Sequence, residues 1–211
     1  MGRATVQRDD CTLTVRRVDL FEQREQPVRV VIDSNLNILK NAAGHDRDRD
    51  RDRDHDHDHD HEEEYSYALF KDGFKTIVYH SCNAHDDGIS NDNPNVTLVN
   101  LSSGTGDQAA RIIQPLQIIQ DLQSKNIRHI MVEGGPATAI QFLNAQLVDR
   151  AIIIRAPVTF IEPVLSGMTD ESLVNAGLEL IEKRICGDDV VEYWVKEGMD
   201  WPTDDVEDWP N

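Results

Sequence analysis

The chain alternates between short apolar runs and longer polar stretches, and the apolar runs are rich in β-branched residues. Runs of this kind, bounded by polar or glycine-containing turns, are typical of buried strands. The first run spans Val28 to Ile32 and ends in the polar pair Asp33 and Ser34. Six runs predict strands, at residues 26–34, 75–82, 96–101, 127–133, 150–160 and 190–198.

Two other regions repeat their apolar residues every three or four positions, which predicts amphipathic helices. In the first region Asp107 is placed to cap a helix and Pro115 occupies a first-turn position. Its apolar face comprises Leu116, Ile118, Ile119 and Leu122. The second helix is expected over residues 136–147, with its inward positions at Ala139, Ile140, Leu143 and Leu147.

Strands and helices therefore alternate, which predicts an α/β fold with a mostly parallel central sheet flanked by helices. Residues 45–64 alternate Arg-Asp and then His-Asp pairs and have no apolar face, so we expect them to form a disordered acidic insertion. We expect one domain over residues 1–186 that contains this insertion. The last strand and an acidic, mobile tail would follow over residues 187–211.

The chain of 211 residues is strongly acidic, with a net charge of −18. Such a charge disfavours nucleic acid and anionic membranes as partners, because both would be repelled. Cys11, Cys82 and Cys186 are scattered without metal-like spacing, which indicates free thiols in a reducing compartment and no zinc site. No run approaches the roughly 18 apolar residues that cross a bilayer. We therefore expect a cytoplasmic protein, or an organellar one whose targeting segment lies upstream.

The stretch "HIMVEGGPATAIQFL", residues 129–143, joins an expected strand to an expected helix through Glu133, Gly134 and Gly135. Two glycines let a ligand approach the backbone, and the N–H groups that begin the next helix attract phosphates. Glu133 stands where α/β sheets usually present ligand-binding groups, and its carboxylate can accept two N–H bonds from an aminopyrimidine ring. An ordinary strand–turn–helix connection with a solvated Glu133 explains the same pattern, so spacing alone leaves both interpretations open.

Three ordered blocks carry a more specific signal. "ATVQRDDCTLTVR" (4–16), "QPVRVVIDS" (26–34) and "VEGGPATAIQFLNAQLVDRAIIIRAP" (132–157) together resemble the reductase half of the riboflavin-biosynthesis deaminase/reductase family. The resemblance implies a dihydrofolate-reductase-like fold and a homodimer. It also implies an NADPH-dependent oxidoreductase that reduces the ribosyl group of 5-amino-6-(5-phosphoribosylamino)uracil to a ribityl chain.

The resemblance also implies roles for individual residues, although it identifies no catalytic side chain. The cofactor-binding positions would be Thr5, Asp9, Ser34, Gly135, Pro136, Ala137 and Thr138. The substrate-binding positions would be Leu13, Arg16 and Glu133, with Arg16 suited to a phosphate by its permanent, fork-shaped charge. Without the resemblance, Asp9 is equally a turn or cap residue, Arg16 a solvated surface charge and Ser34 a turn residue.

The sequence departs from the family pattern in several places. Met1 stands almost on the Gly-x-x-Thr motif, so the family's first strand and helix have no counterpart, and we expect the chain to be incomplete. Cys11 replaces a proline, and Ala137 and Thr138 alter the glycine-rich loop. The zinc-binding signature of the deaminase half is absent from the sequence.

Two alternatives from other classes remain. A non-catalytic or fragmentary subunit with the reductase fold would serve only in assembly. Adventitious metal binding would use His55, His57, His59 and His61, whose imidazoles alternate with aspartates and suit Ni²⁺, Cu²⁺ or Zn²⁺.

Overall fold

The computed structural model describes residues 1–16, 26–39, 67–82, 91–102, 112–158 and 168–202. The expected insertion at 45–64, the cap at Asp107 and the end of the acidic tail lie outside these ranges. The chain forms two compact units, residues 1–135 and 136–211, and each is described by itself. The boundary expected between residues 186 and 187 falls within the second unit.

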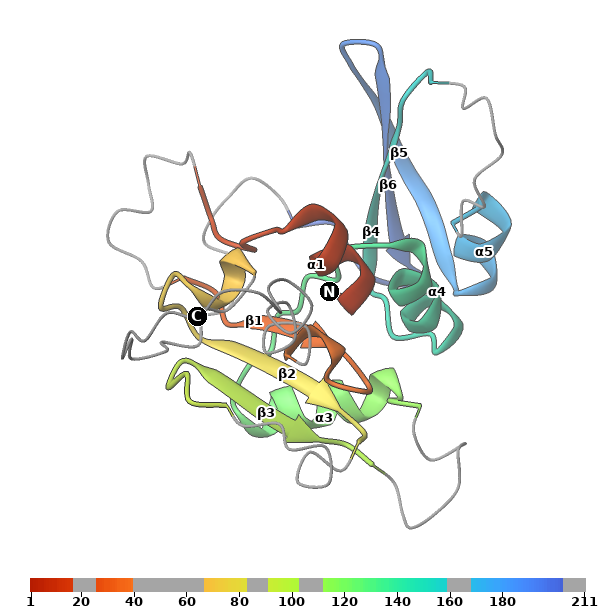
Figure 1. The fold of residues 1–211 in the computed structure, drawn as a ribbon. Helices are drawn as coiled ribbons and strands as arrows, with labels where there is room; N and C mark the ends of the chain where they lie inside the picture. Colours follow the sequence, from red (N-terminus) through yellow and green to blue (C-terminus); the bar gives the residue numbers. More distant parts are fainter. Residues whose placement is uncertain (17–25, 40–66, 83–90, 103–111, 159–167, 203–211) are drawn as a thin grey trace, which may run out of the picture. The chain divides into compact units, whose positions relative to one another are not determined.

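The first unit is built on a parallel sheet in the order β1-β2-β3 (Figure 1). Its strands are β1 (Arg29–Ile32), β2 (Thr76–His80) and β3 (Val96–Asn100), at three of the positions that the apolar runs predict. Val31 pairs with Val78, and Thr76 pairs with Val96. β2 is the central strand and is buried along its whole length, because both faces of the sheet are covered at this strand.

Helices cover both faces of this sheet. On one face, α1 (Arg3–Asp9) places Val6 in a core with Val31 and Val78, to which the 3₁₀ helix η2 (Ala68–Phe70) adds Leu69 and Phe70. On the other face, α3 (Pro115–Ser124) buries Ile118 and Leu122. A hydrogen bond also links β2 to α3, because the hydroxyl of Tyr79 donates to the carboxylate of Asp121 at 2.6 Å. Figure 1 shows α1 and α3 on opposite sides of the strands.

The helix predicted around Pro115 is confirmed, with one difference. Leu116 was placed on the apolar face, but 49% of its side chain is exposed. In a helix of 10 residues only one stripe can face the sheet, and Pro115, Ile118 and Leu122 form it.

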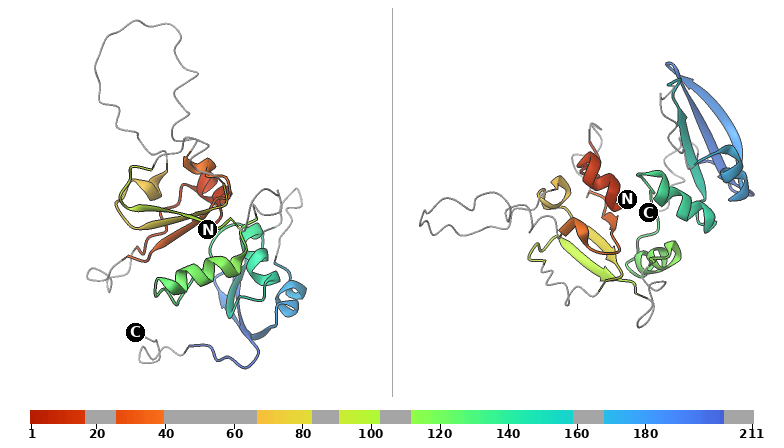
Figure 2. Two further views of the ribbon diagram at one scale, coloured as in Figure 1. Left: turned by 90° about the horizontal axis from the view of Figure 1, so that it is seen from below. Right: turned by 45° about the vertical axis from the view of Figure 1, so that its right-hand side comes forward.

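The second unit is an antiparallel sheet in the order β4-β6-β5. Its strands are β4 (Arg150–Arg155), β5 (Leu178–Cys186) and β6 (Asp189–Lys196). The helices α4 (Pro136–Asn144) and α5 (Asp170–Asn175) lie on one face, as the right-hand view of Figure 2 shows. Together they enclose a small core of Leu143, Leu173, Ala176, Leu178 and Trp194. The sequence analysis identified β4, α4 and β6, but it missed β5 and α5. The helix expected over 136–147 ends at Asn144, and of its four expected inward positions only Leu143 is buried, beside Phe142.

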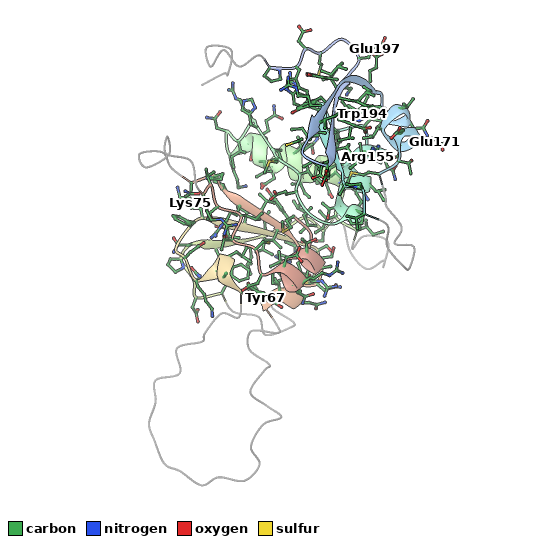
Figure 3. All side chains as sticks on the ribbon, turned by 90° about the horizontal axis from the view of Figure 1, so that it is seen from above. Tyr67, Lys75, Arg155, Glu171, Trp194 and Glu197 are labelled. Carbon is green, nitrogen blue, oxygen red and sulfur yellow. The ribbon has the colours of Figure 1, made fainter. Side chains whose placement is uncertain are left out.

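Glu192 is buried at the centre of this second sheet and is held by three donors. Arg155 and Lys183 donate to its carboxylate at 2.9 and 2.7 Å, and the indole N–H of Trp194 donates at 3.3 Å. Figure 3 labels Arg155 and Trp194 in this unit. Burial alone would raise the pKa of Glu192, but these hydrogen bonds outweigh it and hold the pKa below its ordinary value.

The strand predicted at residues 127–133 is wrong. The segment forms no strand, and Ile130, Met131 and Val132 are exposed by 38, 80 and 36%. A strand exists only where its backbone groups find a partner. At the outer edge of β1 that partner is Met1–Gly2: Gly2 bridges Ile32 in parallel, Met1 N donates to Val30 O, and Ile32 N donates to Met1 O.

Candidate functional site

Two of the three blocks that carry the family resemblance meet at the first turn of α1, through residues 130 positions apart in the chain. The hydroxyl oxygen of Thr5 accepts a hydrogen bond from the backbone N–H of Gly135 at 2.9 Å. This contact lies within the first unit, and it joins a residue near the N-terminus to the Glu-Gly-Gly turn.

Both glycines of the turn are required by this contact. Gly134 has φ +116°, and a Cβ there would lie 3.0 Å from Cγ of Met1 and 3.4 Å from the Thr5 hydroxyl. A Cβ on Gly135 would lie 3.1 Å from the same hydroxyl. A side chain at either position would therefore push the turn away from α1.

Glu133 lies close enough to this contact to act electrostatically on Met1 and Cys11. Burial lowers the pKa of the Met1 amino group, and the neighbouring Cys11 and the Glu133 carboxylate oppose that shift. Burial raises the pKa of the Cys11 thiol, and the carboxylates of Asp9 and Glu133 raise it further. The structure thus places Thr5, Cys11, Glu133 and Gly135 near Met1, with Asp9 close to Cys11.

The remaining predicted cofactor positions lie in two places. Ser34 follows β1, and its carbonyl accepts the backbone N–H of Ser81 at 3.0 Å. Pro136, Ala137 and Thr138 form the first turn of α4 in the second unit, and Thr138 is buried there. Pro136 at the start of a helix is favoured because its ring is preorganised and its missing N–H would be unpaired anyway.

The predicted substrate positions Leu13 and Arg16 lie after α1. Leu13 is half-buried and has φ +50°, a left-handed conformation that is unusual for a leucine. Arg16 is exposed.

Four of the polar residues that the resemblance singles out are not committed to holding the fold. Among the described residues, the side chains of Asp9, Arg16, Ser34 and Glu133 have no hydrogen bond or ion pair. The neighbouring carboxylates differ: Asp10 accepts the N–H of Ala68 at 2.8 Å, and Asp33 accepts that of Ile38 at 2.7 Å. Within the same blocks, Asp10 and Asp33 therefore bind backbone groups of the fold, and the cofactor and substrate roles of the other four residues stay predictions.

The sequence analysis missed two buried polar residues near this cluster. Asp33 is buried at the end of β1, 3.8 Å from Arg3. Arg29 is buried within β1, on the same face as Val31. The available signal was a charged residue at an inward position of an otherwise apolar strand, which marks a satisfied buried charge.

Metal coordination finds no support in the described part of the chain, where no group of three or more His, Cys, Asp or Glu side chains could hold an ion. The histidine tract at residues 55–61 lies outside that part. Nor does any helix of the described residues have the length and apolar character to cross a membrane.

Comparison with known families gives one match. The family described as the RibD C-terminal domain matches residues 1–191. No curated protein matches the chain.

Solved structures give further matches, and each covers 92% of the chain. A diaminohydroxyphosphoribosylaminopyrimidine deaminase/5-amino-6-(5-phosphoribosylamino)uracil reductase from Thermotoga maritima has a TM-score of 0.58 at 16% identity. Acinetobacter baumannii RibD has a TM-score of 0.55 at 17% identity. A pyrimidine reductase-like protein from Corynebacterium diphtheriae has a TM-score of 0.52 at 17% identity. At these identities the likeness shows the fold.

The three blocks therefore led to the correct family, and the predicted α/β fold class is confirmed. The chain spans 44% and 45% of the length of the first two structures and 73% of the third.

Proposed function

From the premise that the chain belongs to the RibD C-terminal domain family, we propose that it is a pyrimidine reductase of riboflavin biosynthesis that uses NADPH. Its substrate would be 5-amino-6-(5-phosphoribosylamino)uracil, a small molecule, and its working form a cytoplasmic or organellar homodimer. The observation that carries the proposal is the contact between Thr5 and Gly135, which joins two blocks of the family pattern at one place.

The residues around this contact suit a dinucleotide. Gly134 and Gly135 have no side chains, which lets this turn approach Met1 and Thr5 closely. The resemblance also assigns the first turn of α4 to the cofactor, and the unpaired N–H groups of a helix N-terminus suit a phosphate. NADPH, when bound, would supply the hydride. Thr5 keeps its hydroxyl proton for donation while it accepts from Gly135, and Ser34 and Asp9 would complete the cofactor contacts.

The substrate would lie on the acidic and basic side chains that remain available. Glu133 would accept two N–H bonds from the pyrimidine ring, and Arg16 would bind the phosphate bidentately. Leu13 would pack against the ring or the ribose. These three residues position the substrate and exclude water from it.

The test is a titration of the purified chain with NADPH, followed by tryptophan fluorescence or heat, with NADH as the comparison. Saturable binding of NADPH that is tighter than that of NADH is expected. Thr5→Val removes the acceptor for Gly135 at almost constant shape, and we expect it to weaken NADPH binding about fivefold, since one hydrogen bond contributes about 1 kcal/mol. Thr5→Ser, which keeps the hydroxyl, should bind within about threefold of the wild type.

Gln120 is exposed on α3, and Gln120→Ala serves as the matched surface control. A folded wild-type chain that binds neither nucleotide would contradict the proposal. That result would favour the alternative of a reductase fold that serves only as an assembly subunit.

A further inference from the structure

Arg29 anchors the segment Thr12–Val15 to β1. Its guanidinium is buried, and one terminal nitrogen donates to the carbonyl of Thr12 at 3.0 Å and to the carboxylate of Asp72 at 2.6 Å. The other terminal nitrogen donates to the carbonyls of Leu69 and Phe74 at 2.6 and 2.7 Å. Because all four bonds converge on one buried group, the carbonyl of Thr12 is fixed relative to the strand.

Gln26 holds the other end of the same segment. Its side-chain oxygen accepts the backbone N–H of Val15 at 2.9 Å, and its side-chain nitrogen donates to the carbonyl of Val15 at 3.4 Å. The amide therefore satisfies both backbone groups of one residue, as a neighbouring strand would do. Gln26 lies three residues before Arg29, so both anchors come from the same stretch of chain.

Leu13 lies between the two anchors and has the left-handed backbone described above, φ +50°. Such a conformation persists in a leucine only where the surroundings over-determine it. The hydroxyls of Thr12 and Thr14 pair with each other at 2.9 Å, which tightens the segment further. Arg16 follows directly after the second anchor.

We propose that Gln26 is a positioning residue, which acts by fixing the backbone of Val15 opposite the Arg29 anchor and thereby presents Leu13 and Arg16 to the phosphorylated substrate. This inference rests on the proposed function and deepens it, because it assigns a task to a residue that no ligand contact requires. It also explains why the second sequence block accompanies the first: "QPVR" holds "TLTV" in place.

The chemistry of the segment favours a substrate role over a purely structural one. A segment that only closed a loop would gain nothing from a strained leucine, and relaxing Leu13 would be cheaper than two anchors. Arg16 is exposed and has no partner among the described side chains. Its side chain therefore loses conformational entropy only when an anion binds. Fixing its backbone beforehand lowers that cost, which would appear in the substrate KM.

The first arm of the test measures amide hydrogen exchange and needs no activity. In the wild type the Val15 amide should be protected, and in Gln26→Ala its exchange should rise at least tenfold. The Val78 amide in the buried strand β2 should be unchanged, which shows that the variant folds. Gln26→Glu keeps the acceptor for the Val15 N–H but not the donor to its carbonyl, so its exchange rate should fall between the two.

The second arm measures steady-state kinetics with 5-amino-6-(5-phosphoribosylamino)uracil and NADPH. Gln26→Ala should raise the substrate KM about tenfold, with kcat and the Kd of NADPH within about twofold of the wild type. Gln120→Ala, on the far face of the sheet, should change none of them. A general loss of stability would lower the active fraction and hence kcat, so the split between KM and kcat identifies positioning.

Each result decides the matter. Unchanged Val15 exchange in Gln26→Ala would overturn the anchor itself, and raised exchange with an unchanged KM would overturn the role in substrate binding. A wild-type chain that fails to bind NADPH would overturn the proposed function and the substrate role with it, whereas the exchange arm would still show whether the anchor exists.

Discussion

The side chain of His80 is buried at the end of β2, with 4% exposed. Its Nδ1 lies 3.1 Å from the carbonyl of Cys82, and the carboxylate of Asp33 is nearby. Burial lowers the pKa of His80 from its ordinary value, and these two groups only partly oppose the shift. The imidazole is therefore neutral in the folded protein at neutral pH.

Because the folded pKa is the lower one, the unfolded chain binds protons more tightly than the folded chain. The contribution of His80 to stability is present above the unfolded pKa of about 6.5 and is lost as the pH falls through the folded pKa. We expect the urea midpoint of unfolding to decrease as the pH is lowered from about 7.5 to about 5.5. The slope of the midpoint against pH should be smaller in His80→Gln. Gln120→Ala removes no titratable group and serves as the control, which should keep the wild-type slope. Equal slopes in all three proteins would contradict the prediction.

Three aspartates in the sequence blocks have different roles, which the sequence alone does not distinguish. Asp9, Asp10 and Asp33 all belong to the blocks that carry the family signal. Asp10 adopts the left-handed C-cap of α1 with φ 42°, and Asp33 is buried against Ile38. Only Asp9 lacks a partner among the described side chains. The hydrogen-bond partner of a carboxylate depends on backbone groups that other segments of the chain place beside it. The spacing of residues in the sequence contains no information about these groups.

Among the elements, α5 shows how a short helix depends on its first residue. The hydroxyl of Thr169 accepts the N–H of Ser172 at 3.1 Å, and the hydroxyl of Ser172 accepts that of Thr169 at 2.9 Å. These reciprocal bonds form a capping box on a helix of 6 residues, which is too short to be stable by itself. The helix contributes the fully buried Leu173 to the core of the second unit.

We expect Thr169→Ala to lower the free energy of unfolding of the second unit by about 1 kcal/mol, since that is typical for a lost N-cap. Thr169→Ser should keep the free energy of unfolding close to that of the wild type, because serine retains the hydroxyl. Urea unfolding followed by tryptophan fluorescence gives the measurement, because Trp194, one of the three tryptophans, is buried in the same core. A loss as large in the serine variant as in the alanine variant would rule out the cap as the cause.

The segment 127–133 shows that the composition of an element does not by itself predict a strand. Its composition predicted a strand as strongly as that of β1 did, yet only β1 is paired. Composition describes which side chains suit a pleated, half-buried surface, but pairing requires a neighbour of matching length and direction. In the described structure Met1–Gly2 takes that place beside β1.

At the scale of the whole molecule, the core of the first unit is assembled from both sides of the low-complexity tract. Leu36 and Ile38 precede it, Leu69 and Phe70 follow it, and all four belong to one cluster of buried side chains. The tract itself supplies no apolar residue to this cluster, because residues 45–64 contain only His, Asp, Arg and Glu. Loop closure depends only weakly on loop length, so the tract is thermodynamically cheap to keep or to remove.

We therefore expect deletion of residues 45–64 to change the thermal midpoint by no more than about 5 °C, because shortening this connection changes the free energy of loop closure by only about 1 kcal/mol. The affinity for NADPH should also be unchanged. Circular dichroism melts of both chains, with and without a chelator, give the measurement. If a chelator destabilised only the full-length chain, the histidine tract would have a metal-dependent role instead.

The sequence by itself determined the family, the α/β class and the positions of β1, β2, β3, α3, α4, β4 and β6. Those features follow from local periodicity and from ordered motifs, which are properties of neighbouring residues. Only the tertiary structure decided that Thr5 bonds Gly135, that Arg29 and Gln26 hold Thr12–Val15, and that residues 127–133 form no strand. The physical reason is that hydrogen-bond partners, burial and strand pairing are set by segments distant in the chain.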